Sequence, residues 1–377
     1  MPFAAALSEH PLPTHATGEV VGEVLERLGG QPPDLAVLFV TRAHLGALED
    51  IAASVRTMLS PGVLLAATAV SVLGGRDEAE EVPAVSLWAG HTGAVRPVSL
   101  SAVPTGEGMA VVGLEPEALQ EADTLLLLAD PSFPVEPLLA TLQEHQPQLR
   151  VVGGLASAGF GPGGNRLVVD DQMFDQGAVG VVLGAHQVAD SVVSQGCAPV
   201  GSPLTVTRAE GNMVHEIAGR PALERVQELI VSLSDDERAK AAQGLHVGRV
   251  IDEHKIDFER GDFLVRNVLG ADRDNGAVAI GDEVNIGDTI QFQVRDAESA
   301  DTDLRLALDG RRASGALVFT CNGRGSRLFG TPHHDAGVVA ETLGTVAVGG
   351  MFCAGEIGPV GGRNFLHGFT ASIVLFP

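Results

Sequence analysis

Residues 348–355 read Val-Gly-Gly-Met-Phe-Cys-Ala-Gly, and residues 152–159 read Val-Gly-Gly-Leu-Ala-Ser-Ala-Gly. Five of the eight positions are identical, and a sixth has Cys353 where the other copy has Ser157. Each stretch is followed within three residues by Gly-Pro and then by Gly-Gly. The copies start 196 residues apart, which is about half the chain, whereas solenoid repeats recur every 20–50 residues or so. The pattern therefore predicts a duplicated domain.

We expect two related units, over residues 1–198 and 199–377. The boundary lies where Ala198-Pro-Val-Gly-Ser-Pro203 interrupts the regular pattern, before a new helix with Pro221 in its first turn. If the units are duplicates, superposition should pair equivalent residues of the repeated stretches. The expected pairs are Gly153 with Gly349, Gly154 with Gly350, and Ser157 with Cys353.

A strand, a helix and a second strand follow one another three times along the chain. Continuous apolar runs predict the leading strands at residues 35–40, 125–128 and 316–319. Apolar residues at helical spacing predict the helices that follow, over residues 45–59, 137–145 and 335–343. Alternating apolar residues between Leu245 and Val294 predict antiparallel strands. We therefore expect a mixed α/β or α+β fold in which helices cover mixed β-sheets.

The chain is strongly acidic. Its 377 residues include 48 Asp and Glu against 24 Lys and Arg, a formal net charge of -24. Such a charge repels phosphate backbones and anionic lipid surfaces, so neither nucleic acid nor a membrane is expected as a partner. The longest apolar stretch, Gly62 to Leu73, is shorter than the roughly 20 residues of a membrane-spanning helix.

Cysteine usage and the N-terminus favour a cytoplasmic protein. Cys197, Cys321 and Cys353 are too few for a disulfide framework, and their spacings fit no zinc pattern. The first residues have neither the basic start nor the apolar core of a secretory signal.

The best candidate for a binding site is the loop Thr320-Cys-Asn-Gly-Arg-Gly-Ser326. It follows a buried apolar strand and precedes a helix, and open α/β sheets bind ligands beyond the carboxyl ends of their strands. Gly323 and Gly325 allow close approach of the backbone to a ligand, and Arg324 can offer a planar fork to a carboxylate. The alternative is a tight turn whose arginine points to solvent. Cys321 is either a nucleophile or a small buried apolar residue.

A second Gly-rich segment, Gly349 to Asn364, contains one acidic residue, Glu356. If Arg324 and Glu356 face the same crevice, the pair suits a zwitterion, with the guanidinium on its carboxylate and Glu356 on its ammonium group. The alternative is that the two side chains pair with each other. We expect the loop from Cys321 to Ser326 and the segment from Cys353 to Asn364 to line one concave site.

Several other motifs do not indicate a site. Gly159-Phe-Gly-Pro-Gly-Gly164 satisfies G-x-G-x-x-G, but it contains Pro162 and leads into an apolar run rather than a helix, so no dinucleotide cofactor is expected. His333-His334-Asp335 is typical of a helix start rather than of a metal site, and no metal is expected. The acidic run from Arg76 to Glu81 is interpreted as a solvated loop.

The chain resembles the FIST family (F-box and intracellular signal transduction proteins). The resemblance is carried by the segments Gly219–Leu223, 316–325, 355–359 and 364–370, and in the first half by 152–157, Thr207 and Gly211-Asn212. It implies an N-terminal FIST unit followed by a FIST C unit in a bacterial sensory domain for small ligands, amino acids among them. Carried over to this chain, the motif positions are Cys321, Asn322, Gly323, Arg324, Gly325, Glu356 and Asn364. Secondary candidates are Gly153, Gly154, Ser157, Gly349, Gly350, Cys353 and His367.

Three functions remain open on these residues. The first is a sensory protein that binds an amino acid or a related small carboxylate and acts through a separate signalling partner. The second is an enzyme with Cys321 as nucleophile, which requires a base such as His367 or His333. The third is an adaptor whose loops bind another protein.

Overall fold

The computed structural model describes residues 2–106, 108–115, 119, 121–255, 258 and 261–377. By their contacts they form two compact units. The first comprises Met1–Val193, Leu304–Leu366 and Thr370–Pro377, and the second comprises Ser194–Asp303 and His367–Phe369. Helices and mixed sheets occur together, so the expected mixed α+β class is confirmed.

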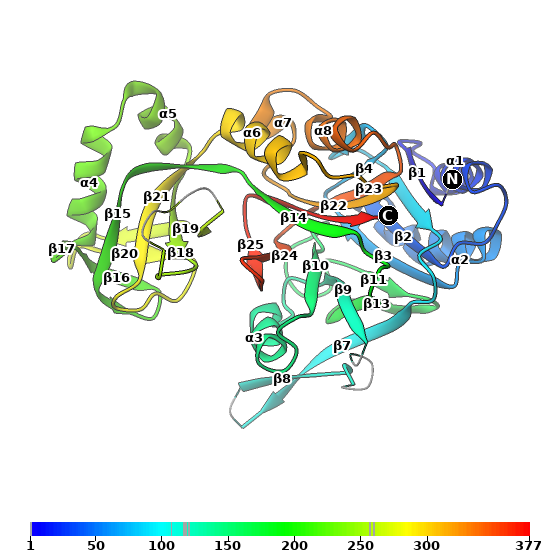
Figure 1. The fold of residues 1–377 in the computed structure, drawn as a ribbon, viewed down its shortest axis with the longest axis horizontal. Helices are drawn as coiled ribbons and strands as arrows, with labels where there is room; N and C mark the ends of the chain where they lie inside the picture. Colours follow the sequence, from blue (N-terminus) through cyan, green and yellow to red (C-terminus); the bar gives the residue numbers. More distant parts are fainter. Residues whose placement is uncertain (1, 107, 116–118, 120, 256–257, 259–260) are drawn as a thin grey trace. The chain divides into compact units, whose positions relative to one another are not determined.

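Three sheets build the first unit (Figure 1). The first sheet has the order β1 (Phe3–Ser8), β6 (Val85–Gly90), β2 (Leu35–Thr41), β3 (Val63–Ala69), β11 (Leu167–Val169) and β12 (Gln172–Phe174). The second has the order β25 (Arg363–His367), β24 (Glu356–Val360), β10 (Arg150–Leu155), β9 (Ala122–Ala129), β13 (Ala178–Gly184), β7 (Arg96–Thr105) and β8 (Gly108–Val112). The third has the order β14 (Asp190–Gln195), β26 (Thr370–Phe376), β22 (Gly315–Cys321), β23 (Val348–Cys353), β4 (Ser71–Gly74) and β5 (Asp77–Glu80).

The three sheets share one plan. In each, a strand-helix-strand copy supplies a parallel pair, namely β2 with β3, β9 with β10, or β22 with β23. The closing strand of the same copy, β6, β13 or β26, runs antiparallel beside the first strand. A hairpin strand from a different copy, β11, β24 or β4, runs antiparallel beside the second strand. The strand-helix-strand pattern predicted three times is therefore present. The hairpin of the first copy joins the third sheet, that of the second copy joins the first sheet, and that of the third copy joins the second sheet.

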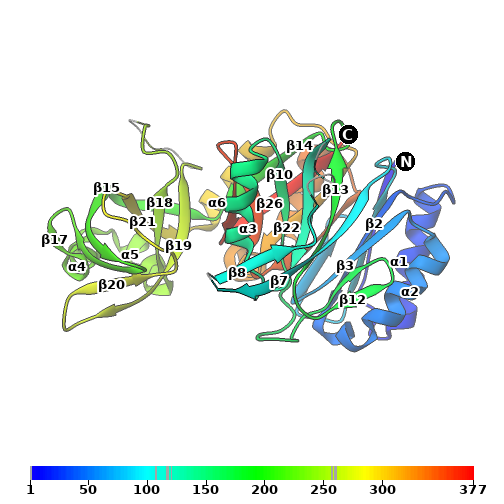
Figure 2. The ribbon, with the colours of Figure 1, turned by 90° about the horizontal axis from the view of Figure 1, so that it is seen from below.

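One apolar core lies between the three sheets, and helices cover their other faces. The core includes Phe39 of β2, Leu126 of β9 and Phe319 of β22, all fully buried. The helices are α1 (Pro13–Arg27) and α2 (Leu48–Leu59) on the first sheet, α3 (Val135–His145) on the second (Figure 2), and α8 (His334–Leu343) on the third, labelled in Figure 1. Among the described residues, further short or connecting helices are η1 (Arg42–Ala47), α6 (Ala297–Leu308) and α7 (Ser326–Phe329). Both faces of each sheet are thus buried, which is why the central strands read as continuous apolar runs.

The repeated Gly-rich stretches lie in β10 and β23, the second parallel strands of the second and third copies. A Cβ atom at Gly153 would lie 1.8 Å from the Leu127 carbonyl oxygen of the neighbouring strand. At Gly350 it would lie 2.0 Å from the carbonyl oxygen of Val318. Glycine is therefore required by close strand packing at both places, and the residue-by-residue superposition of the two stretches stays a prediction.

The second unit is a closed barrel. Its strands follow the order β15 (Cys197–Glu210), β21 (Thr289–Arg295), β18 (Leu245–Val250), β19 (Phe263–Asp272), β20 (Ala277–Ile280) and β16 (Met213–Ile217), and β16 pairs back to β15. The antiparallel strands expected between Leu245 and Val294 are part of it. The short strand β17 (Arg220–Pro221) and the helices α4 (Ala222–Ser232) and α5 (Asp235–Gln243) complete the unit.

The chain enters the second unit at Ser194 and leaves it after Asp303, so most of residues 304–377 fold with the N-terminal strands. The predicted units 1–198 and 199–377 were defined by repeated sequence rather than by contacts, and this division stays a prediction. Within the described residues, no helix has the length and apolar character needed to cross a membrane.

Candidate functional site

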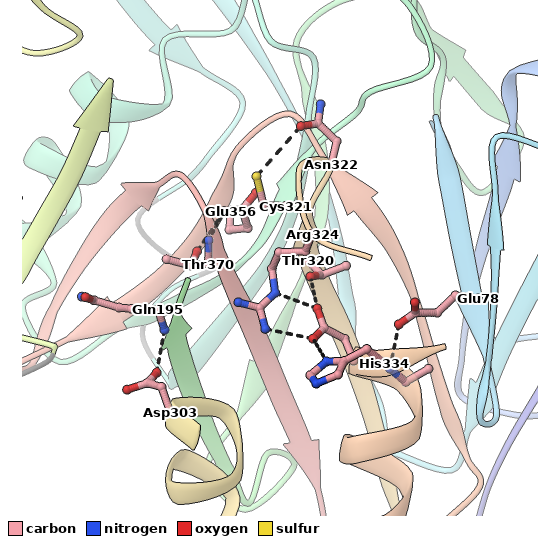
Figure 3. Close-up of polar contacts among 12 residues, drawn as sticks. Glu78, Gln195, Asp303, Thr320, Cys321, Asn322, Arg324, His334, Glu356 and Thr370 are labelled. Carbon is pink, nitrogen blue, oxygen red and sulfur yellow. Dashed lines mark hydrogen bonds and ion pairs between the residues drawn. The ribbon is translucent and has the colours of Figure 1, made fainter. Parts of the chain in front are cut away.

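Arg324 and Asp335 form a fully buried ion pair in the first unit (Figure 3). Arg324 lies in the loop after β22, and Asp335 lies in the first turn of α8. The Arg324 Nε and Nη2 atoms donate to the two carboxylate oxygens of Asp335 at 2.7 and 2.9 Å. The planar fork of the guanidinium is thus already occupied by a carboxylate of the same chain.

The surroundings of Asp335 keep it charged. Its carboxylate also accepts hydrogen bonds from Thr320 Oγ1 at 2.6 Å and from His334 Nδ1 at 3.0 Å. Burial alone would raise the pKa of Asp335, but the Arg324 guanidinium and these donors hold that pKa well below its usual range. The pair therefore carries one positive and one negative charge at neutral pH.

Glu356 begins β24 and lies opposite Gly154 of β10. Its Oε2 atom accepts hydrogen bonds from the Thr370 backbone N–H at 3.1 Å and from Thr370 Oγ1 at 2.9 Å. Burial raises the pKa of Glu356 to about 8, although the Thr370 donors and the charge of Arg324 act in the opposite direction. At neutral pH the carboxyl group is therefore mostly protonated.

Two cysteines lie beside Glu356. Cys321 ends β22 and is 8% exposed, and Cys353 ends β23 and is fully buried. The Cys321 thiol is close enough to Glu356 to favour its carboxylate form. Burial, with the nearby Glu356, raises the pKa of Cys353 well above its ordinary value.

A third buried carboxyl group, Glu78, comes from β5 of the first copy. Its Oε1 atom accepts a hydrogen bond from the backbone N–H of Ala336 at 2.9 Å, next to Asp335. Burial, and then the negative charge of Asp335, raise the pKa of Glu78 to about 7. The interpretation of residues 76–81 as a solvated loop was wrong, because this run forms a strand that places Glu78 in the interior.

Three polar atoms of this cluster make no hydrogen bond with the residues that the structure describes. They are Nη1 of Arg324, Oε1 of Glu356 and Oε2 of Glu78, and all three are buried. A buried polar atom without a partner costs about 1–3 kcal/mol, so such atoms are rare in native interiors and call for a physical reason. We refer to Arg324, Asp335, Glu356, Glu78 and Cys321 together as the buried cluster.

The glycines and Asn322 shape the loop that holds Arg324. The Asn322 backbone N–H donates to the carbonyl oxygen of Cys353 at 2.9 Å, and its side chain accepts a weak hydrogen bond from the Cys321 thiol. Gly325 has a φ of 65°, and a Cβ atom there would lie 2.9 Å from the Glu80 carboxylate. That carboxylate accepts hydrogen bonds from the backbone and hydroxyl of Ser326 at 2.9 and 2.6 Å. Gly323 lies between Asn322 and Arg324 in the same turn.

Two other predicted site residues, Asn364 and Ser157, hydrogen-bond to backbone atoms. Asn364 holds the start of β10, where it accepts from Val151 N–H at 2.9 Å and donates to Leu149 at 2.7 Å, at the opposite end of β10 from Gly154. The Ser157 hydroxyl accepts from Val70 N–H at 2.9 Å and donates to the carbonyl of Phe352.

Three further residues considered from the sequence are not members of the buried cluster, although one of them contacts Glu78. Gly349 makes room for Trp88, since a Cβ atom would lie 2.7 Å from that side chain. His367 is grouped with the second unit. His333 Nδ1 accepts from the Glu78 backbone N–H at 2.8 Å.

Neither alternative for Arg324 holds. Its side chain is 1% exposed, so it does not point to solvent, and its partner is Asp335 rather than Glu356. Arg324 and Glu356 are nevertheless close enough that each shifts the pKa of the other.

The sequence interpretation included Thr320 in the candidate loop but missed Asp335, Thr370 and Glu78 as site residues. A signal was present for Asp335, which follows Thr331-Pro332 at a helix start beyond a buried strand, where the helix N-terminus favours a carboxylate. Nothing local marked Glu78, because its neighbours in the cluster lie more than 200 residues away in the sequence.

Comparison with known proteins covers most of the chain. The FIST N domain model matches residues 34–220, and the FIST C domain model matches residues 222–359. The chain is 43% identical over 384 residues to an uncharacterized protein of Mycobacterium tuberculosis, covering 100% of both chains. It is 43% identical over 368 residues to an uncharacterized protein of Mycobacterium bovis, covering 96% of this chain and 95% of that protein.

Proposed function

Because the chain belongs to the FIST family, whose domains are generally regarded as small-ligand sensory domains, we propose that it binds a small ligand at the buried cluster. The ligand class that fits best is an amino acid or a related small carboxylate. The output passes to a separate signalling protein.

The observation that carries this proposal is the pair of polar atoms without partners on Arg324 and Glu356. Nη1 of Arg324 is a charged donor, and Oε1 of Glu356 accepts a hydrogen bond or, when protonated, donates one. A ligand that supplies an acceptor to the first and a donor to the second recovers the cost of leaving both atoms unpaired.

The occupied fork changes what Arg324 offers to a ligand. Since Nε and Nη2 each donate to Asp335, the two N–H groups of Nη1 are left for a ligand carboxylate. A ligand carboxylate would therefore meet the Nη1 side of Arg324 in charge-assisted hydrogen bonding, while Asp335 occupies the Nε and Nη2 edge and holds the guanidinium in place.

Glu356 is the group that distinguishes an amino acid from a simple acid. Its carboxyl is mostly protonated at neutral pH, and a bound ammonium group would favour its ionised form. Binding of an amino acid should therefore release a proton, whereas binding of an acid without an ammonium group should not.

A thermal-shift panel of amino acids and small acids tests the proposal. A ligand at 100 times its dissociation constant stabilises the folded state by about 2.7 kcal/mol. Each kcal/mol moves the melting midpoint of a protein of this size by roughly 2–4 °C, so at least one compound should shift it by several degrees. Glu356→Gln should remove the shift given by ammonium-bearing ligands, and Glu341→Gln, at an exposed position, should not. A panel without any shift at millimolar concentrations would refute ligand binding and favour the adaptor function.

One observation favours a second candidate, cysteine-dependent catalysis. The Cys321 thiol has the Glu356 carboxyl group as a neighbour, and the ionised form of this group, the minor form at neutral pH, can act as its base in place of the histidines considered from the sequence. Consumption of a ligand during the thermal-shift assay, abolished in Cys321→Ser, would support this function.

A further inference from the structure

Cys321 and Cys353 are direct partners in neighbouring strands. They are the last residues of β22 and β23, and the parallel register of these strands pairs their Cα atoms. Neighbouring strands lie about 4.8 Å apart, and disulfides join Cα atoms about 4.4–6.8 Å apart. The backbone separation thus suits a disulfide between the two residues.

Both side chains lie on the same face of the third sheet. Phe319 and Met351 belong, with Cys353, to the core between the sheets, and Cys321 follows Phe319 by two positions. Because side chains alternate along a strand, Cys321 faces the same side as Cys353. The two thiols also influence each other and Glu356 electrostatically, which places all three groups together.

The two thiols differ in access. Cys321 is slightly exposed and lies near the positive charge of the Arg324 guanidinium. Cys353 is fully buried, and its Sγ faces β10, where a Cβ atom at Gly154 would lie 2.4 Å from it. Its hydrogen bond to the Met351 carbonyl oxygen is weak, at 3.6 Å, so a rotation about the Cα–Cβ bond toward Cys321 would give up only a weak contact there.

We propose that Cys321 and Cys353 form a reversible disulfide when the protein meets a hydroperoxide, with Cys321 reacting first. The Cys321 thiolate attacks the peroxide, so that an S–O bond forms and the O–O bond breaks, and the departing oxygen leaves as an alcohol or water. Cys353 then attacks the sulfenic sulfur, the S–S bond forms, and the second oxygen leaves as water with the Cys353 proton. Two thiols are oxidised by two electrons, and one hydroperoxide is reduced.

This inference rests on the strand pair and is independent of ligand binding. Where both hold, the disulfide would tie the loop of Arg324 to the segment of Glu356 and remove a thiol from beside Glu356. Oxidation would then change the affinity for the ligand.

Peptide mapping of the full-length protein tests the proposal. The protein is treated with stoichiometric hydrogen peroxide, blocked with N-ethylmaleimide and digested with trypsin without reduction. Cleavage at arginines separates the two cysteines into peptides 313–324 and 328–363, while Cys197 lies in peptide 167–208. We expect most chains to yield 313–324 linked to 328–363, lighter by two hydrogen atoms than the separate peptides, and the link to disappear with dithiothreitol.

Variants assign the order of reaction. Cys197→Ser should leave the link unchanged, because this residue belongs to the other compact unit. Cys353→Ser should stop the reaction at a sulfenic acid on Cys321 that dimedone labels, and Cys321→Ser should give no label on Cys353. Full alkylation of both cysteines in the peroxide-treated wild-type protein, or a link that includes Cys197, would overturn the proposal.

Discussion

Two copies of the same topology end their first strand very differently. In the second copy, Asp130 follows β9, and its carboxylate accepts from the Ser132 backbone and hydroxyl and from Asn165 Nδ2 at 2.9, 2.5 and 3.2 Å. In the third copy, the residues beyond β22 form an ion pair and leave buried polar atoms of Arg324 and Glu356 without partners among the described residues. One strand end is thus closed by its own loop, whereas the other leaves buried polar atoms that, in our proposal, a ligand contacts.

The largest expected effect is the difference between two substitutions, one in the buried ion pair and one in the hydrogen-bonded loop of the second copy. Asp335→Asn leaves the Arg324 guanidinium buried without a counter-charge, which should cost about 3–5 kcal/mol of unfolding free energy. Asp130→Asn disturbs hydrogen bonds but leaves no charge behind, and should cost about 1–3 kcal/mol. Urea unfolding of both variants at pH 7 gives the comparison. Equal losses would show that breaking the ion pair costs no more unfolding free energy than breaking the hydrogen bonds of Asp130.

A second prediction uses the raised pKa of Glu356. Because its folded pKa of about 8 exceeds the unfolded value near 4.5, the folded state holds the proton more tightly, and unfolding free energy falls as pH rises between these values. The contribution of this group reaches at most about 1.4 kcal/mol per pH unit. Glu356→Gln should therefore flatten the decline between pH 5 and 8, as measured by unfolding at several pH values. An unchanged slope would mean that Glu356 is ionised in the folded protein.

A smaller loss of stability is expected when the hydroxyl groups that donate to Glu356 and Asp130 are removed. Thr370→Val removes one donor to Glu356, and Ser132→Ala removes one donor to Asp130, each at a cost of about 1 kcal/mol. The loss in Thr370→Val should be greater at pH 9 than at pH 6, because the donor favours the ionised carboxylate. Ser132→Ala should show the same loss at both pH values in thermal unfolding. A pH-independent loss for Thr370→Val would contradict the assignment.

Local patterns predicted the elements better than the site. Apolar runs marked β2 and β22, and helical spacing marked α2 and α8, because these signals depend on neighbouring residues. Arg324 and Glu356 stood out as charged residues among glycines. Asp335 was marked in the sequence as a carboxylate at a helix start, but its pairing with Arg324 depends on how α8 begins after the loop and could not be predicted. The burial of Glu78 could not be predicted from its neighbours in the sequence. It depends on the hairpin of β4 and β5, which joins the sheet of another copy.

Calorimetric titration with the amino acid that gives the largest thermal shift tests ligand binding at the buried cluster most directly. Titrations at pH 7 in two buffers of different ionisation enthalpy measure how many protons are released on binding. We predict release of nearly one proton per ligand in the wild-type protein, together with affinity that rises toward pH 8, and neither in Glu356→Gln. Binding without proton release, with the same affinity in the wild-type protein and in Glu356→Gln, would contradict a ligand site at Arg324 and Glu356.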